Sequence, residues 1–163
     1  MKKIIKYSFF TIVLSFVIGN LTFVHAEYVL PYPSFMPGNK LYRISRLIDV
    51  MKKYWYFGDI AQFKYRLTLS DKYLVEAKTL FEYKQYLLGF DALKRSSTEW
   101  QKAVPTTPSM LLSYQEAAKK HIEVLERMDV PDNFLWSPEK SASSKLPLRG
   151  EIENAIQLRK KTL

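Results

Sequence analysis

Cysteine is absent from this 163-residue chain, and its absence excludes several classes of protein at once. Without thiols the chain has no disulfide, no zinc–thiolate or iron–sulfur site, and no lipid attached through cysteine. Histidine is nearly absent too, since only His25 and His121 occur. His25 falls in an N-terminal segment that we expect to be removed, which excludes paired histidine ligands in the remainder. We interpret His121 as a hydrogen-bonded residue at the edge of a buried helical stripe, and we expect no metal ligand.

Glycine is scarce as well, with five residues and no cluster. The chain therefore lacks a phosphate-binding loop, a dinucleotide fingerprint and a G-x-S-x-G nucleophile motif. Paired carboxylates remain as the one catalytic alternative, because a glycosidase needs two acids across a cleft. The candidate acids are Asp71, Glu76, Glu123 and Glu126. Helical acids interleaved with lysines are more often solvated, so we predict no catalytic residue, no cofactor and no enzymatic activity.

Acidic residues are outnumbered, at 16 against 25 basic residues. The first 26 residues hold three lysines and no acid, so the remainder carries 22 − 16 = +6. Such a charge suits contact with an anionic surface such as lipid headgroups or wall polymers, and simple solubility is the competing explanation.

Residues 1–26 have the layout of a secretory signal. Lysines open the segment, an apolar stretch covers residues 8–18, and Val24 and Ala26 place small residues before a cut. An uncut anchor is the alternative, although residues 7–24 are barely long enough to span a bilayer. We predict cleavage after Ala26 and an exported, extracytoplasmic protein, which makes nucleic acid an unexpected partner.

Residues 27–38 form a proline-rich arm. Three prolines between positions 31 and 37 fix φ and remove backbone donors, which excludes a helix or a central strand. The arm is also apolar and aromatic, so it is poorly suited to free solution. We expect Tyr32, Phe35 and Met36 to pack on the body that follows.

Apolar residues recur at three- and four-residue steps through most of the remaining chain, and no alternating strand pattern of useful length occurs. The predicted helices cover residues 39–57, 59–81, 86–104, 108–129 and 147–161. We predict an all-α antiparallel bundle of four to five helices, with a hairpin over residues 59–104 at its core. The bundle domain is residues 39–129, a linker covers 130–146, and a C-terminal helix lies within 147–163.

The first two predicted helices carry the clearest stripes. The first stripe, expected to face the core, is Leu41, Ile44, Ile48, Met51 and Trp55. The second repeats in steps of three and four and is Ile60, Phe63, Leu67, Ser70, Leu74, Ala77 and Phe81. Asp59 and Gln62 have the spacing of a capping box at the start of the second helix.

Aromatic residues gather beside lysines at two places. The candidate interaction surface is Lys52, Lys53, Tyr54, Trp55, Tyr56, Tyr83 and Tyr86. The rings near the end of the first helix point to every side of one turn, so they cannot all enter one core. Either the arm and the second helix cover them, or they remain exposed and contact a membrane interface or sugars.

Two segments carry a family resemblance. Leu30-Pro31-Tyr32-Pro33, followed by Pro37-Gly38-Asn39-Lys40-Leu41-Tyr42, resembles the entry motif of a bacterial family catalogued as domain of unknown function 5667. Leu69-Ser70-Asp71-Lys72-Tyr73-Leu74-Val75-Glu76-Ala77 is similar to the family's second hallmark. The resemblance covers about residues 29–96, with Ser34 in place of glycine and Lys40 in place of proline. It implies an exported or membrane-anchored helical domain and no reaction or ligand.

The sequence thus favours an exported, non-catalytic helical module at the outer side of the cytoplasmic membrane. Its expected partner is an unknown protein or an anionic envelope component. Membrane contact would come from an uncleaved signal or from the aromatic-basic surface. A wall- or glycan-acting hydrolase that uses helical carboxylates and a purely structural spacer are the alternatives.

Overall fold

A computed structural model describes residues 28–32, 35–136 and 144–163. The described elements, in chain order, are α2 (Lys40–Trp55), α3 (Asp59–Glu82), α4 (Tyr86–Lys102), α5 (Pro108–Glu126), β1 (Phe134–Trp136), β2 (Ser144–Leu146) and α6 (Leu148–Lys160). The prediction of an all-α helical bundle is confirmed. The predicted signal, residues 1–26, lies outside the described residues. No helix in the described part of the chain combines the length and hydropathy that a membrane span requires.

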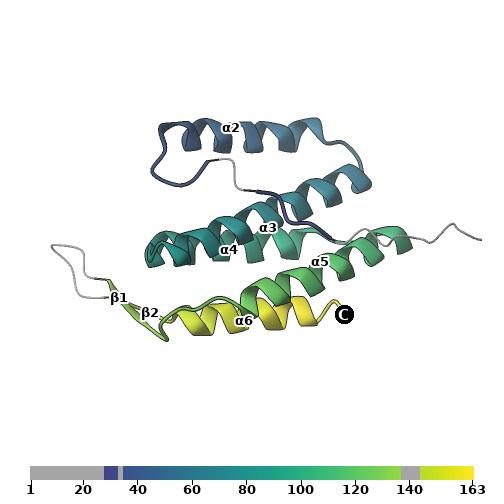
Figure 1. The fold of residues 1–163 in the computed structure, drawn as a ribbon. Coiled ribbons are helices and arrows are strands. Elements are labelled where there is room, and N and C mark those ends of the chain that lie inside the picture. The colour runs from purple at the N-terminus through teal and green to yellow at the C-terminus, as the bar shows by residue number, and fades with distance from the viewer. Residues whose placement is uncertain (1–27, 33–34, 137–143) are drawn as a thin grey trace, which may run out of the picture.

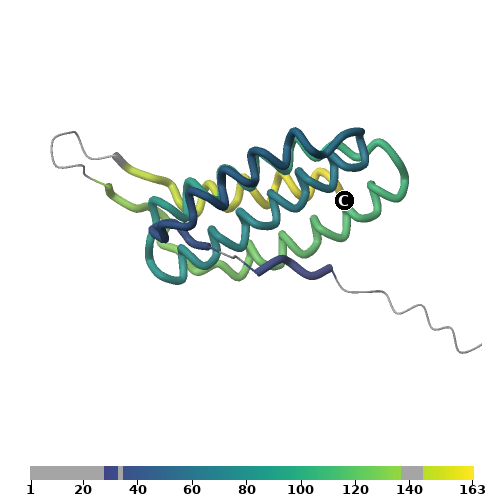
Figure 2. Tube along the Cα trace, turned by 90° about the horizontal axis from the view of Figure 1, so that it is seen from above, coloured from purple at the N-terminus to yellow at the C-terminus, as the bar shows by residue number. Residues whose placement is uncertain are grey.

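The helices form three layers, with α2 on one side, α3 and α4 in the middle, and α5 and α6 on the other side (Figures 1 and 2). The α3–α4 pair is the predicted antiparallel hairpin. Its close packing depends on Gly89, where an added Cβ would lie 2.6 Å from the ring of Phe81. The turn between the helices holds Lys84 at a φ of 58°.

The interior divides into two main clusters of buried apolar side chains. One joins the hairpin turn to α6 and is built on Leu74, Ala77, Leu80, Phe81, Phe90, Ala92, Leu93, Leu125, Val130, Leu148, Ile152 and Ala155. The other lies near the α4–α5 connection and is built on Phe63, Leu67, Trp100, Ala103, Met110, Tyr114, Ala117 and Ala118. The last helix, α6, docks on the bundle through the side that carries Leu148 and Ile152.

Two local predictions are wrong. The predicted linker contains an antiparallel ribbon in which Phe134 pairs with Leu146, and both side chains pack on the first cluster. Strands of three residues are too short to show an alternating pattern, which is why the sequence did not reveal them. The expected capping box does not form either. Gly58 precedes α3 without a side-chain cap, and the Gln62 amide instead donates to the carbonyl oxygens of Lys53 and Tyr56.

Most of the predicted α3 stripe is buried, with Ile60 exposed at its start. In α4 and α5 the predicted stripe residues Phe90, Leu93, Trp100, Tyr114, Ala118, Ile122 and Leu125 are buried. At single positions the neighbour is buried instead, with Ser96 in place of Ser97 and Met110 in place of Leu111. These shifts are small. The stripe of α2 departs from prediction completely.

Candidate functional site

Helix α2 turns a polar side toward α3. The Lys72 ammonium of α3 donates to the Ser45 hydroxyl at 3.1 Å and forms an ion pair with Asp49. The Tyr65 hydroxyl donates to the backbone carbonyl of Asp49 at 2.5 Å. Asp49 is the one buried residue within α2. Because these residues follow one another at helical spacing, a whole side of α2 is fixed to α3 by polar contacts.

The same side of α2 is anchored at its N-terminal end by a second polar group. The Tyr42 hydroxyl donates to Glu76 at 2.6 Å, and Arg95 donates to that hydroxyl oxygen at 3.3 Å. Burial raises the pKa of Glu76, although the bond from Tyr42 and the charge of Arg95 act in the opposite direction. Burial also raises the pKa of Tyr42. Glu76 was expected to be solvated, and its burial beneath α2 corrects that expectation.

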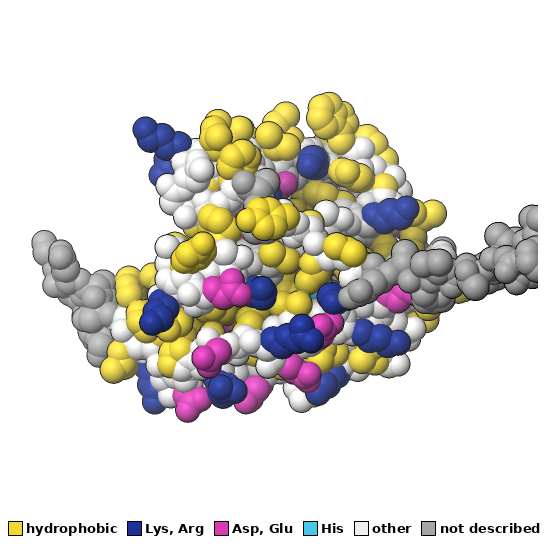
Figure 3. Space-filling view, viewed as in Figure 1, with side chains coloured by type: hydrophobic (Ala, Val, Ile, Leu, Met, Phe, Trp, Pro, Cys, Tyr) yellow, Lys and Arg dark blue, Asp and Glu magenta, His cyan; other side chains and the backbone are white. Residues whose placement is uncertain are grey.

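With its polar side turned inward, α2 presents its apolar stripe outward. The predicted buried stripe is wrong, because its five side chains are between 47% and 76% exposed. We define the outer face of α2 as Ile44, Leu47, Met51, Tyr54 and Trp55. These positions lie within about 100° of arc at 100° per residue, on the side away from Ser45 and Asp49. Hydrophobic side chains gather along this edge of the molecule (Figure 3).

Basic residues accompany the outer face. They are Lys40, Arg43, Arg46, Lys52 and Lys53. The single acid in α2 is Asp49, and Lys72 neutralises it. Arg46 is half-buried and its charge acts on Glu76, whereas Lys40 and Arg43 are exposed. An apolar strip bordered by exposed cations is the pattern of helices that lie in the interface of an anionic membrane.

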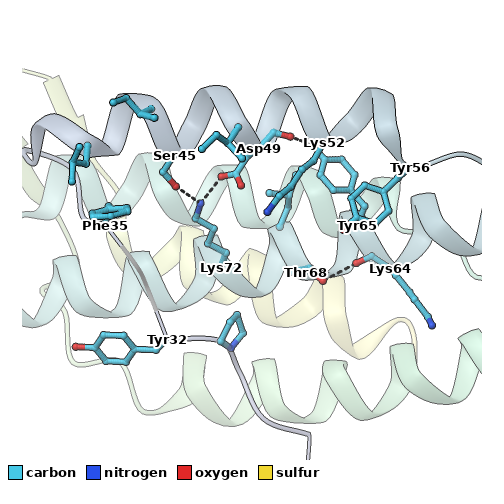
Figure 4. Close-up of a pocket in the computed structure, with 15 residues that line it drawn as sticks. Tyr32, Phe35, Ser45, Asp49, Lys52, Tyr56, Lys64, Tyr65, Thr68 and Lys72 are labelled. Carbon is cyan, nitrogen blue, oxygen red and sulfur yellow. Dashed lines mark hydrogen bonds and ion pairs between the residues drawn. The ribbon is translucent and has the colours of Figure 1, made fainter.

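A cavity of about 710 Å³ lies between α2, α3 and the arm (Figure 4). Its residues are Pro31, Tyr32, Phe35, Leu41, Ile44, Ser45, Ile48, Asp49, Lys52, Tyr56, Lys64, Tyr65, Thr68, Leu69 and Lys72. The walls are mainly apolar, and Lys52 extends from α2 into the gap above α3. A smaller cavity of about 360 Å³ continues along α2 beside Met51 and Trp55.

The residues of the predicted interaction surface occupy two separate places. Tyr54 and Trp55 are exposed on the outer face of α2, whereas the Tyr56 ring stacks on Tyr65 with 5.4 Å between centroids. Lys53 lies over the Tyr54 ring at 5.9 Å, and Lys52 lines the cavity.

Tyr83 and Tyr86 lie at the other end of the hairpin. This end is about 35 Å from the start of α3 at 1.5 Å per residue. Tyr83 is exposed, and the Tyr86 ring packs against Phe134 at 5.3 Å. The structure therefore does not join these two tyrosines to the aromatic end of α2.

The arm divides in the same way. Met36 packs against the first core cluster, and Phe35 lines the cavity. Tyr32 corrects the expectation of packing, because it is 92% exposed. Its ring extends sideways along the direction of the helices and not toward α2 (Figure 4). Tyr28, which was not predicted, adds a hydrogen bond from the arm to the buried Asp71 and packs against the second core cluster.

A charged network fills the interior beneath the site. The Arg159 Nε–H donates to His121 Nδ1 at 2.8 Å, so the histidine proton is on Nε2, which donates to Asp71 at 2.7 Å. The Tyr28 hydroxyl donates to the other Asp71 oxygen at 2.6 Å. Burial lowers the pKa of His121 to about 4, and the bond to Asp71 opposes this shift. The histidine is therefore neutral, and the carboxylate and guanidinium balance each other.

The rest of the Arg159 side chain is also satisfied. Its guanidinium donates to the Ser96 hydroxyl at 2.9 Å and to the Ala155 carbonyl at 3.0 Å, and it lies over the Trp100 ring at 5.1 Å. Burial lowers its pKa to about 10. Asp71 was expected to be solvated and His121 to lie at the edge of a buried stripe, and both are buried, as is Arg159 in the last turn of α6.

The other candidate acids remain at the surface of α5. Glu123 pairs with Lys120 at 3.0 Å and with Arg127 at 2.9 Å, and Glu126 lies 3.7 Å from Lys160. The described residues contain no group of three or more side chains that would hold a metal ion. Two facing acids across a cleft are likewise not found among the four candidates, because Asp71 and Glu76 are both committed to buried hydrogen bonds.

Sequence reasoning missed the inward polar side of α2 and the role of Arg159. A signal for each was present. Tyr42, Ser45 and Asp49 recur at three- and four-residue steps and form a polar stripe beside the apolar one. Arg159 follows Ile152 by seven residues and Ala155 by four, so it shares their buried side, unlike its lysine neighbours.

Comparisons of this chain with protein-family models, with curated proteins and with solved structures find no match. The resemblance to domain of unknown function 5667 therefore stays a prediction that rests on the motifs quoted above.

Proposed function

We propose that this chain is an exported, non-catalytic helical module that attaches to the anionic outer face of the cytoplasmic membrane. The outer face of α2 is the attachment surface. The observation that supports this most directly is the inverted orientation of α2, which keeps its polar side on α3 and leaves its apolar stripe in solvent.

The chemistry of the outer face favours a lipid surface over a sugar or a nucleic acid. Burial of a large apolar side chain stabilises by about 1.5–3 kcal/mol, and each basic residue near an anionic leaflet adds about 1 kcal/mol. Tyr54 and Trp55 are residue types that favour the headgroup region, where an aromatic ring is partly buried and its polar atom stays hydrated. Lys40 and Arg43 are exposed on the same helix, where their charges favour an anionic surface.

The two alternative functions receive less support. A hydrolase needs an acid with access to substrate, and Glu76 is fully buried while Glu123 is engaged with two basic residues on α5. A spacer needs an even, polar surface, and the exposed stripe of α2 is far from even.

Vesicle binding tests the proposal. The chain from Glu27 onward, which contains every described residue, is sedimented with vesicles of phosphatidylglycerol and phosphatidylcholine or of phosphatidylcholine alone. We expect binding to the anionic vesicles and its loss at high salt, because screening weakens contacts at the surface. Replacement of Leu47 and Tyr54 by serine should weaken binding by at least about tenfold, since two apolar contacts of about 1 kcal/mol each are removed.

A matched double variant provides the control. Tyr83 and Leu112 are exposed to a similar degree but lie on other parts of the bundle, so their replacement by serine should leave vesicle binding unchanged. Equal binding to neutral vesicles, or equal losses in the two double variants, would contradict the proposal.

A further inference from the structure

The cavity beside α2 has a composition that the attachment of α2 to a membrane does not require. Its volume of about 710 Å³ lies within the 300–1,000 Å³ that small-molecule sites occupy. Phe35, Leu41, Ile44 and Leu69 give it apolar walls. Such a site takes a largely apolar ligand with a few polar atoms.

The charges of the cavity define the polar part of that ligand. Asp49 is the only acid in the lining, and it is already paired with Lys72. Lys52 and Lys64 form no ion pair with any other residue in the described ranges. The Lys64 ammonium points away from the gap beneath α2, whereas Lys52 extends into it (Figure 4). The charge offered to a ligand is therefore positive and comes from the Lys52 ammonium.

The polar and apolar parts lie at different ends. Lys52, Lys64 and Tyr56 lie near the C-terminal end of α2 and the N-terminal half of α3, whereas Phe35 and Leu41 lie near the start of α2 (Figure 4). The polar cluster of Ser45, Asp49 and Lys72 between these ends is satisfied internally.

We propose that this cavity binds one molecule of a single-chain amphiphile with an anionic headgroup, of the fatty-acid class. The alkyl chain lies along Ile44, Leu41 and Phe35, and the headgroup contacts the ammonium of Lys52. Ile44 belongs to both the cavity and the outer face of α2, but Thr68 and Leu69 of α3 belong to the cavity alone, so binding in the cavity can be tested apart from the attachment of α2 to a membrane.

Titration calorimetry with dodecanoate below its micelle concentration tests the site on the chain from Glu27 onward, with helix content followed by circular dichroism. We expect saturable one-to-one binding, at least about tenfold tighter than that of dodecyltrimethylammonium, which has the same alkyl chain and a cationic headgroup. Equal affinities for the two amphiphiles, or dodecanoate binding seen only when the acid is supplied within vesicles, would overturn the proposal.

Two pairs of variants locate the ligand. Thr68→Trp places a large side chain at the exposed floor of the cavity and should weaken binding by at least about tenfold. Thr98→Trp is its control, because Thr98 is also exposed and makes the same 2.9 Å bond to the carbonyl four residues earlier, on α4. Unchanged affinity in Thr68→Trp would overturn the site.

Lys52→Met should weaken dodecanoate binding about fivefold, and Lys53→Met should leave it unchanged, because Lys53 does not line the cavity. The serine variant of Leu47 and Tyr54 should retain dodecanoate binding while it loses vesicle binding. A dodecanoate affinity that is the same in Lys52→Met and the unaltered chain would overturn the headgroup assignment.

Discussion

Helices α2 and α3 carry apolar stripes of the same spacing, yet the two stripes end in opposite environments. The α3 stripe forms the centre of both core clusters, whereas the α2 stripe faces solvent. The difference comes from the polar residues. The polar residues of α2 lie on one side and form hydrogen bonds with Lys72, Tyr65 and Glu76 of α3. The polar side of α2 therefore faces inward. A stripe shows that a helix has two faces, and its partners decide which face is buried.

The interior of the bundle should be the more sensitive of the two regions, and Arg159→Met tests this most strongly. The change leaves the Asp71 carboxylate buried beside a neutral histidine, so we expect a loss of about 3–5 kcal/mol in the free energy of unfolding. Urea denaturation measures it. Lys160→Met changes the next, exposed residue and should stay within about 0.5 kcal/mol. If Arg159→Met lowers the free energy of unfolding by less than about 1 kcal/mol, the interior is no more sensitive to substitution than the surface.

Acid should destabilise the bundle through His121. Its pKa falls from 6.5 in the unfolded chain to about 4 in the fold, so the unfolded state binds more protons between these values. The stabilising contribution is complete above pH 6.5 and is lost as pH falls toward 4, by up to about 3 kcal/mol. Thermal unfolding between pH 7 and 5 should show this slope, and His121→Gln should flatten it. An equal slope in both proteins would show that His121 is not the titrating group.

Gly89 lies where two helices pack tightly, whereas Gly150 lies where an added methyl group has room. Gly89→Ala places a methyl group 2.6 Å from the buried Phe81 ring and should lower stability by about 1–3 kcal/mol. Gly150→Ala in α6 meets nothing closer than 3.7 Å and should raise stability by up to about 1 kcal/mol, because alanine favours the helix. Melting temperatures that move in the same direction would contradict the close approach of α3 and α4.

The smallest effect is expected on the outer face of α2. Leu47→Ala removes an exposed side chain and should change the free energy of unfolding by less than about 0.5 kcal/mol. Leu93→Ala removes a side chain of the same size from the first core cluster and should cost about 2–5 kcal/mol. Similar losses for the two leucines in urea denaturation would mean that the α2 stripe is covered in solution.

The sequence allowed the helices and the hairpin to be predicted because local spacing determines them. The 3-4-3-4 repeat from Phe63 to Phe81 needed no partner to be recognised, and α2 begins within one residue of its predicted start at residue 39. The inward side of α2 could not be predicted in the same way, because it depends on the pairing of Asp49 with Lys72, 23 residues later.

The cavity and the buried network of Asp71, His121 and Arg159 could not be predicted from the sequence. His121 bonds to Asp71, which lies 50 residues earlier in the chain, and to Arg159, which lies 38 residues later. Charged residues usually stay at the surface, so composition argued against a buried triad, and only three-dimensional contacts reveal one. The cavity depends on how far α2 stands from α3, which no local pattern specifies.

The two ends of the described chain meet at one carboxylate, and this has a consequence for the order of events during synthesis. Asp71 accepts from Tyr28 directly and is balanced by Arg159 through His121. A chain that emerges from its N-terminus exposes Asp71 and His121 long before Arg159 exists to accompany them. The buried network that joins Asp71, His121 and Arg159 therefore cannot be completed until α6 has been synthesised.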